Sequence, residues 1–538
     1  MKSETSKMPN MSRLLSDYLT GAGQANEFFH HDVHGASIDK RLKYLQSHPV
    51  RREELTAVIE SYMEPLGISK KARKHLDELK ENAVVVIGGQ QAGLLTGPLY
   101  SVHKVISIVI MAKKYRAMTG VPVIPIFWIA GEDHDLDEIN HTYTISSGKL
   151  RKHAVPIPYM QKSMAAETAL DQNEVMDFVD EVFRQFGETI HTESLLAEVK
   201  EVLSVSTTFT DFFARLMNSL FQNEGLLLID AAYGPLRTYE SSFFEKLIDR
   251  SEEIAEAVFA KEAIMEQAGY GQPVGVSQDA AHLFYLQNGE RALLKRVDGD
   301  FVNETLGLHF TKSELMSIAK TSPQLLSNNV VTRPIMQDLV FPVLTFVGGQ
   351  GEIAYWGLLK EAFEVMGIEM PIVAPRFSIT LVDRQVEQLL KEEKMSVEDV
   401  FQGSVSVKRE EFLTSVSDSQ TETLLNETQQ LILEKYEQIK DAAKVNGLLT
   451  QQLIDKNVSF HLSQLAYLKG KLEESTLIRH DVQLRRYETL MNHLLPEGGL
   501  QERKYNPYMY LNQYGPDLIN DLLKLDYRCD GSHHIVYL

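Results

Sequence analysis

Two polar clusters that follow apolar runs contain the residues best suited to catalysis. In the first, Tyr100 lies three residues before His103 and four before Lys104, so a helix would place all three on or near one face. A histidine and an ammonium group in this arrangement could bind phosphate and stabilise the charge that develops during group transfer. The same spacing also fits a surface-facing His–Lys pair without a catalytic role.

The second cluster, AGEDHDLDEINH, directly follows the apolar run VIPIFWI. His134 and Glu138 stand four residues apart, as a metal pair or an acid/base dyad on a helix would require. A divalent-metal hydrolase is therefore one candidate class, although no second histidine-rich motif completes a ligand set. Carboxylates that only complement the positive end of a helix would explain Glu132, Asp133 and Asp135 equally well.

A third group surrounds the apolar run near residue 343. Arg333 could hold a carboxylate or phosphate through two parallel hydrogen bonds, a geometry that lysine does not offer. After the run, Glu352 adds a carboxylate, and Tyr355 and Trp356 could line an apolar or ring-binding wall. A structural ion pair for Arg333 and core roles for the aromatics fit the sequence as well. Arg376, after a further strand, is a similar but weaker candidate.

These residues need strands and turns to bring them together, and the stretch VVVIGGQQAGLLTGPLYSVHK at 84–104 predicts such a unit. The β-branched run at 84–87 indicates a buried strand. Gly88 and Gly89 would then let the chain turn tightly and approach a ligand. Thr96 would cap a helix that has Pro98 in its first turn. Together with the strand candidate PVIPIFWIA, this makes a βαβ unit.

Apolar residues precede Gly-Gly-Gln at 88–90 and again at 348–350, and a helix start follows each copy. The repeat predicts an α/β fold whose two halves form one doubly wound sheet, with a binding crevice at the carboxyl ends of the strands. Coincidence of ordinary turn residues is the alternative. We expect a helical segment at 1–80, the first half of the sheet at 81–150, a mixed insertion with a core strand near 225–233 at 151–320, the second half at 321–383, a helical arm at 384–500 and a tail packed on the core at 501–538.

From about residue 384 the sequence predicts long helices. Leu425, Ile432, Tyr436 and Ile439 follow one another at steps of seven, four and three, which keeps them on one helical stripe. A second long helix over about 448–494 would complete an antiparallel coiled-coil hairpin, which we expect to form a homodimer. A helical bundle within one chain is the alternative.

Composition limits the classes of partner. The chain has 538 residues, which is enough for roughly two to four domains. Its 54 Lys and Arg against 74 Asp and Glu give a net charge of −20, which argues against a general nucleic-acid binder. The start has no apolar signal core, and no run reaches the roughly 18 apolar residues of a membrane span, so we expect a cytoplasmic protein. The single Cys529 excludes an internal disulfide and any two-cysteine metal motif.

The glycine-rich stretch at 84–104, PIFWIAGEDHDLDEINH, RPIMQDLVFPVLTFVGGQGEIAYW and the arm together resemble the cysteine ligase family of bacillithiol biosynthesis, over essentially the whole chain. The resemblance implies that the carboxyl of L-cysteine is joined to the amine of glucosaminyl malate, with ATP and Mg for activation and no tightly bound metal. It also implies a core similar to class I aminoacyl-tRNA synthetases and nucleotidyltransferases, with connecting-peptide insertions. Where that fold carries His-x-Gly-His, YSVH keeps only His103. Activation through an adenylate or an acyl phosphate, and a nucleotide-binding regulatory protein with a degenerate core, are both compatible with these departures.

The resemblance and the residue patterns together define one set of candidate site residues. The catalytic candidates are His103, Lys104, Asp133 and His134. The substrate-binding candidates are Gln91, Thr96, Tyr100, Glu132, Asp135, Arg333, Gln337, Glu352, Tyr355 and Trp356. The nucleotide-binding candidates are Gly88, Gly89, Gly97 and Gly349, with a second, noncatalytic site in the tail at Arg503, Lys504 and Tyr508. Tail tyrosines that only pack onto the core are the alternative to this second site.

Overall fold

The computed structural model describes residues 1–33, 35–146, 148–157, 163–445 and 451–538, which divide into two compact units. The first unit comprises residues 1–382 and 499–538, and the second comprises residues 383–498. All of the candidate site residues belong to the first unit.

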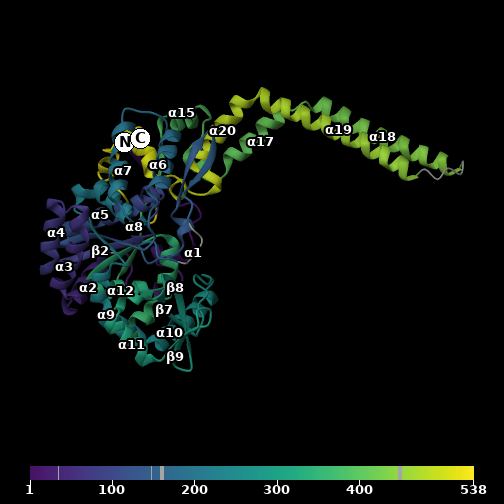
Figure 1. The fold of residues 1–538 in the computed structure, drawn as a ribbon. Coiled ribbons are helices and arrows are strands. Elements are labelled where there is room, and N and C mark those ends of the chain that lie inside the picture. Colours follow the sequence, from purple (N-terminus) through teal and green to yellow (C-terminus); the bar gives the residue numbers. More distant parts are fainter. Residues whose placement is uncertain (34, 147, 158–162, 446–450) are drawn as a thin grey trace. The chain divides into compact units, whose positions relative to one another are not determined.

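A five-stranded parallel sheet lies within the first unit (Figure 1). The strands follow the order β6-β3-β2-β12-β13, so the chain builds outward from β2 in one direction and later restarts beside β2 with β12. Because β12 pairs directly with β2, the prediction that the two Gly-Gly-Gln stretches belong to one sheet is confirmed. The strands are β2 (Val84–Gln90), β3 (Val123–Ile129), β6 (Leu227–Asp230), β12 (Val343–Gly348) and β13 (Ile372–Pro375).

The strands are continuous apolar runs because helices cover the sheet. Every residue of β3, β6 and β12 is buried. α5 (Leu99–Thr119) connects β2 to β3 and packs against both, while α3 (Arg52–Met63) packs against β6 and α2 (Gly35–Ser47) against β12. The carboxyl ends of β2 and β12 therefore meet where the strand order reverses, which is where open parallel sheets bind ligands.

The glycine corner after β2 differs from the prediction. Gly88 and Gly89 still belong to the strand, where they pair with Phe127 and Trp128 of β3. A Cβ atom on Gly88 would lie 2.7 Å from the carbonyl oxygen of Val347, so this glycine permits β2 and β12 to approach. The tight turn comes later, at 93–97, and α5 begins only at Leu99 with Pro98 as its N-cap. The prediction that Thr96 caps this helix is wrong, since no side-chain bond caps α5 and Thr96 itself is fully buried with a positive φ.

Smaller sheets complete the strand content of the first unit. An antiparallel sheet of order β10-β9-β8-β7-β11 contains a hairpin that turns at Asn288 and Gly289, which both adopt positive φ. β15 lies between β1 and β14, so the two ends of the chain join one sheet. The strands are β1 (Lys2–Ser6), β4 (His141–Ser146), β5 (Lys149–Ala154), β7 (Ala280–Gln287), β8 (Glu290–Val297), β9 (Asp300–Asn303), β10 (Leu308–Phe310), β11 (Leu326–Asn328), β14 (Ser378–Val382) and β15 (His533–Tyr537).

The helices of the first unit bury apolar faces, and several start at a side-chain cap. Thr208, for example, accepts a hydrogen bond from the Asp211 backbone at the start of α8. No helix in the described part of the chain is long and apolar enough to cross a bilayer. The remaining helices are α1 (Arg13–Thr20), α4 (Lys70–Glu81), α6 (Gln172–Phe186), α7 (Thr192–Val205), α8 (Phe209–Phe221), α9 (Gly234–Asp249), α10 (Ser251–Gln267), α11 (Lys312–Thr321), α12 (Thr332–Val340), α13 (Gln350–Trp356), α14 (Lys360–Val365), α21 (Pro507–Tyr514) and α22 (Leu518–Leu522).

The second unit is helical, and its two longest helices lie side by side (Figure 1). Lys440, late in α18, pairs with Asp455, early in α19, whereas Glu422 pairs with Lys469, so the two helices are antiparallel. The second helix predicted over about 448–494 is broken at His480, which precedes α20, and the first predicted residues, 448–450, lie outside the described residues. The helices are α15 (Arg384–Glu392), α16 (Val397–Phe401), α17 (Ser404–Val416), α18 (Ser419–Val445), α19 (Gln451–Arg479) and α20 (Asp481–Leu494).

Candidate active site

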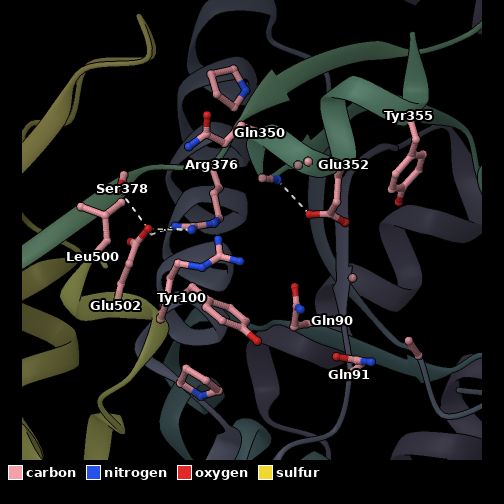
Figure 2. Close-up of a pocket in the computed structure, with 18 of the residues that line it drawn as sticks. Gln90, Gln91, Tyr100, Gln350, Glu352, Tyr355, Arg376, Ser378, Leu500 and Glu502 are labelled. Carbon is pink, nitrogen blue, oxygen red and sulfur yellow. Dashed lines mark hydrogen bonds and ion pairs between the residues drawn. The ribbon is translucent and has the colours of Figure 1, made fainter. Parts of the chain in front are cut away.

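A cavity of about 500 Å³ lies at the carboxyl ends of β2 and β12, where the strand order reverses. Figure 2 shows side chains from both halves of the sheet and from the tail in its walls. This volume is in the range of small-molecule and cofactor sites. The polar side chains that line it belong to Gln90, Gln91, Tyr100, Glu138, His141, Arg333, Gln350, Glu352, Tyr355, Arg376, Ser378, Glu502 and Arg503.

A buried ammonium group holds one wall of the cavity in place. Lys104 Nζ donates to the Gly89 carbonyl at 2.6 Å, to Gln90 Oε1 at 3.0 Å and to the carboxylate of Glu352. Burial lowers the pKa of Lys104, and the Glu352 carboxylate opposes that shift. The same carboxylate accepts from the Gly349 backbone at 2.8 Å (Figure 2). Lys104 therefore ties the end of β2 to the start of α13, and the alternative of a surface-facing lysine is wrong.

Arg333 and Tyr355 form a second polar wall. Arg333, from α12, donates to Tyr355 Oη at 2.5 Å, and both side chains line the cavity. Burial raises the pKa of Tyr355 to about 12, so its phenol stays protonated at neutral pH. Two predicted partners lie elsewhere: Trp356 is buried and stacks on Phe346 at 4.2 Å between ring centroids, and Gln337 is buried without lining the cavity.

Arg376 reaches the third wall and binds a carboxylate that comes from the tail. Its guanidinium donates to Glu502 through two hydrogen bonds, at 2.9 and 2.6 Å (Figure 2). His103 Nδ1 lies 3.0 Å from the same carboxylate. Because an ionised carboxylate only accepts, the bonding pattern assigns the imidazole proton to Nδ1. His103 has no exposed surface and does not line the cavity, so its predicted direct contact with a phosphate is not supported.

Sequence reasoning missed Glu502 altogether. Burial alone would raise its pKa, but the charge of Arg376 and the bond from His103 hold that pKa well below the usual range. The residue stands in the polar run QERKY, which marks neither a strand end nor a glycine turn. Its partner His103 is 399 positions away, so no local signal in the sequence could have found the pair.

The acidic cluster after β3 is divided among different environments. Glu132 forms a buried ion pair with Arg237 and does not line the cavity. Asp133 accepts a hydrogen bond from Gln91 Nε2 at 2.8 Å, and of these two only Gln91 lines the cavity. Asp135 is exposed. Asp133, which was predicted to be catalytic, is thus separated from the cavity by the side chain of Gln91.

The helix that would place His134 and Glu138 on one face does not form. The segment contains only a 3₁₀ turn over Leu136–Glu138, so the metal pair inferred from their spacing is wrong. His134 lies instead near Arg291, with 3.3 Å between Nδ1 and the guanidinium, whereas Glu138 and His141 line the cavity. The described residues include no group of three or more His, Cys, Asp or Glu side chains placed to hold a metal ion.

The tail occupies the helix start where phosphates were expected. The Tyr505 carbonyl accepts the first backbone N–H of α5 at 2.7 Å, and Asn506 Nδ2 donates to the Gly97 carbonyl at 3.0 Å. Thr96 and Gly97 are buried under this contact and neither lines the cavity. The expectation that phosphates rest on this helix start is therefore not supported by the structure.

The proposed stacking surface in the tail is also absent from the described structure. Tyr508 and Tyr510 are 2% and 1% exposed, so they pack the tail onto the core as the alternative reading held. Lys504 lies over the ring of Tyr143 at 4.5 Å. Arg503, by contrast, belongs to the cavity at the sheet, so it joins the principal site instead of a second one.

The strand order and the position of the cavity define a Rossmann-like ligand-binding domain, which this chain combines with a coiled-coil unit. The sequence matches the family description "Bacillithiol biosynthesis BshC, N-terminal Rossmann-like domain" over residues 1–377 and "Bacillithiol biosynthesis BshC, C-terminal coiled-coil domain" over residues 379–538. The chain belongs to the BshC family of bacillithiol biosynthesis, as its resemblance indicated.

Similar proteins span the whole chain. A protein named "Putative cysteine ligase BshC" from Lysinibacillus sphaericus is 46% identical over 538 residues and covers 100% of both chains. Proteins of the same name from Bacillus velezensis and Geobacillus kaustophilus are 37% and 36% identical, with 98% and 99% of each chain covered.

Proposed function

We propose that this chain ligates L-cysteine to the amine of glucosaminyl malate in the cavity at the carboxyl ends of β2 and β12. The observation that carries the proposal is the convergence of Arg333, Arg376 and Glu352 on that cavity in a chain of this family. The reaction needs sites for anionic groups and for ammonium groups, and the cavity has side chains of both kinds. We further propose that the core is related to class I synthetases, which the strand order supports.

The arginines supply the anion sites. Arg333 and Arg376 come from the second half of the sheet and Arg503 from the tail, and all three line the cavity. A guanidinium can bind a phosphate or a carboxylate through paired N–H groups. ATP, with Mg, would supply the activation of the cysteine carboxyl, and the cavity volume and the three guanidinium groups fit a nucleotide.

Glu352 and Gln90 supply acceptors opposite these cations. Lys104 and the Gly349 backbone fix the Glu352 carboxylate, whose side chain keeps 24% of its surface exposed. We assign Glu352 to the amino group of a substrate, which it can hold by accepting hydrogen bonds. Asp133 can fix the orientation of the Gln91 side chain in the cavity wall, because Gln91 donates to that carboxylate and lines the cavity itself.

The coiled-coil unit is proposed to form a homodimer. Leu453, Phe460 and Tyr467 repeat every seven residues on α19 and are 69%, 59% and 64% exposed. A second copy of the chain would cover this stripe in the way that heptad positions usually pack.

Reconstitution tests the ligase directly. Purified chain is incubated with cysteine, glucosaminyl malate and ATP, and the thiol product is measured by mass spectrometry; serine in place of cysteine is the matched control. The ratio of AMP to ADP formed distinguishes an adenylate from an acyl phosphate. Nucleotide binding without product, under conditions in which the protein is folded, would favour the regulatory alternative.

A further inference from the structure

The buried carboxylate of Glu502 accepts hydrogen bonds from four different residues. It accepts from Arg376 twice, from His103 Nδ1 at 3.0 Å, from Ser378 Oγ at 2.9 Å and from the Ile379 backbone at 3.1 Å. Its side chain has no exposed surface. A carboxylate in such a place stays ionised because every donor favours the charged form.

The arrangement leaves Arg376 held on one side and available on the other. Of its five N–H groups, two point to Glu502 and one more donates to the Phe377 carbonyl at 3.2 Å. The described residues supply no acceptor for the other two, and the side chain keeps 10% of its surface exposed in the cavity wall. A guanidinium with free N–H groups beside a cavity is suited to an anionic ligand.

His103 completes the charge balance of this cluster. Burial lowers its pKa, so the imidazole is neutral at physiological pH although Glu502 opposes the shift. The ion pair of Glu502 and Arg376 therefore has no excess positive charge from the histidine. The Nδ1–H bond fixes the rotation of the carboxylate. The carboxylate in turn fixes the plane of the guanidinium (Figure 2).

We infer that Glu502 is a positioning residue for the anionic substrate of the ligase: it orients Arg376 so that its remaining N–H groups bind a phosphate or carboxylate in the cavity. This inference rests on the proposed function. His103 is a positioning residue as well: it orients the Glu502 carboxylate, which in turn orients Arg376.

The test is Glu502→Gln, with separate titrations of ATP, glucosaminyl malate and cysteine. We expect the KM of one anionic substrate to rise about tenfold to a hundredfold, because the ion pair that orients the guanidinium is replaced by weaker bonds to a neutral amide. The other KM values and kcat should change less than about threefold, as for loss of uniform binding. The substrate whose KM rises identifies whether Arg376 binds a phosphate or a carboxylate. Unchanged KM values for all three substrates would overturn the inference.

Introducing Glu502→Gln into a second parent protein, the Arg376→Lys variant, distinguishes a positioning role from a general structural effect. Arg376→Lys keeps the positive charge beside Glu502 but loses the planar fork, so adding Glu502→Gln to it should raise the same KM by less than about twofold. Thr380→Val removes another buried hydrogen bond of β14, to His533, and should leave all KM values unchanged. An equally large KM increase in the Arg376→Lys background would show that Glu502 does not act through Arg376.

Failure of the proposed function gives a different result. If the wild-type chain makes no product, calorimetric binding of ATP and of glucosaminyl malate is compared between the wild type and Glu502→Gln. A tenfold or greater loss of affinity for one of them would still support the positioning role. Equal affinities would overturn it.

Discussion

Replacing Lys104 by methionine should destabilise the parallel sheet by about 2–3 kcal/mol. Removing one partner of a buried ion pair costs about 3–5 kcal/mol, because the other charge stays buried without compensation. Lys104 is 1% exposed, but the Glu352 side chain keeps 24% of its surface exposed and retains its bond to the Gly349 backbone, so we expect a cost at or just below the lower end of that range. The Gly89 carbonyl also loses a donor at 2.6 Å.

Tryptophan fluorescence in urea measures this loss of unfolding free energy in the first structural unit, which contains the sheet. The chain has two tryptophans, Trp128 in β3 and Trp356 in α13, and both are buried in the first unit. The fluorescence transition therefore reports on the sheet and not on the coiled-coil unit. Lys113→Met is the matched control on α5: its side chain is 50% exposed, and loss of its pair with Glu224 should change the free energy of unfolding by less than about 1 kcal/mol.

The opposite outcome would refute the structural role of Lys104. If Lys104→Met unfolds at the same urea concentration as the wild type and only the KM for ATP rises, the ammonium group binds phosphate, as the sequence spacing suggested. In that case the contact with Glu352 is not what holds the wall of the cavity.

Further predictions concern the sheet, the buried charges and the coiled coil. Gly88→Ala should lower the free energy of unfolding by about 1–3 kcal/mol in the same urea assay, because the new Cβ meets the β12 backbone, whereas Gly351→Ala, with nothing within 4 Å, should not. Burial raises the pKa of Glu240 to about 8, so the folded state keeps a proton that the unfolded state releases above about pH 4. Stability from this group is complete below that pH and is lost as the pH rises through 8. The urea midpoint of Glu240→Gln should therefore depend less on pH between pH 5 and 9 than that of the wild type. The same pH dependence in both proteins would contradict the raised pKa of Glu240. Phe460→Lys with Tyr467→Lys should halve the mass in light scattering while helix content is retained, and a persistent dimer would place the interface elsewhere.

The sheet could be predicted from the sequence because its strands are apolar runs, and buried parallel strands have few other signatures. The repeated Gly-Gly-Gln also placed β2 and β12 in one sheet. The exact end of β2 could not be predicted, since Gly88 looks like a turn residue. Its neighbour Val347, which explains why a glycine is needed there, is more than 250 positions away.

The residues of the cavity were predicted less completely than the sheet. Arg333, Glu352 and Tyr355 line it because they flank strand ends, the feature that the sequence shows. His103 and Lys104 were read as ligand-binding groups, although the apolar residues around them on α5 indicate a buried helix on all sides. The histidine's partner comes from the tail and depends on tertiary contacts alone.

Two ion pairs in the cavity wall are compatible with an anion site in an acidic chain. The chain carries a net charge of −20, yet Glu352 is neutralised by Lys104, and Glu502 by Arg376. Among the lining side chains that the structure describes, Arg333 and Arg503 then stand against the single carboxylate of Glu138. Because charges in a cavity are screened less than charges on the surface, this local excess would favour the proposed anionic substrates, even though the whole molecule is negative. Consecutive residues of one helix, His103 and Lys104, thus contact two carboxylates from different parts of the chain, and Arg333 and Arg503 are left for the proposed anionic substrate.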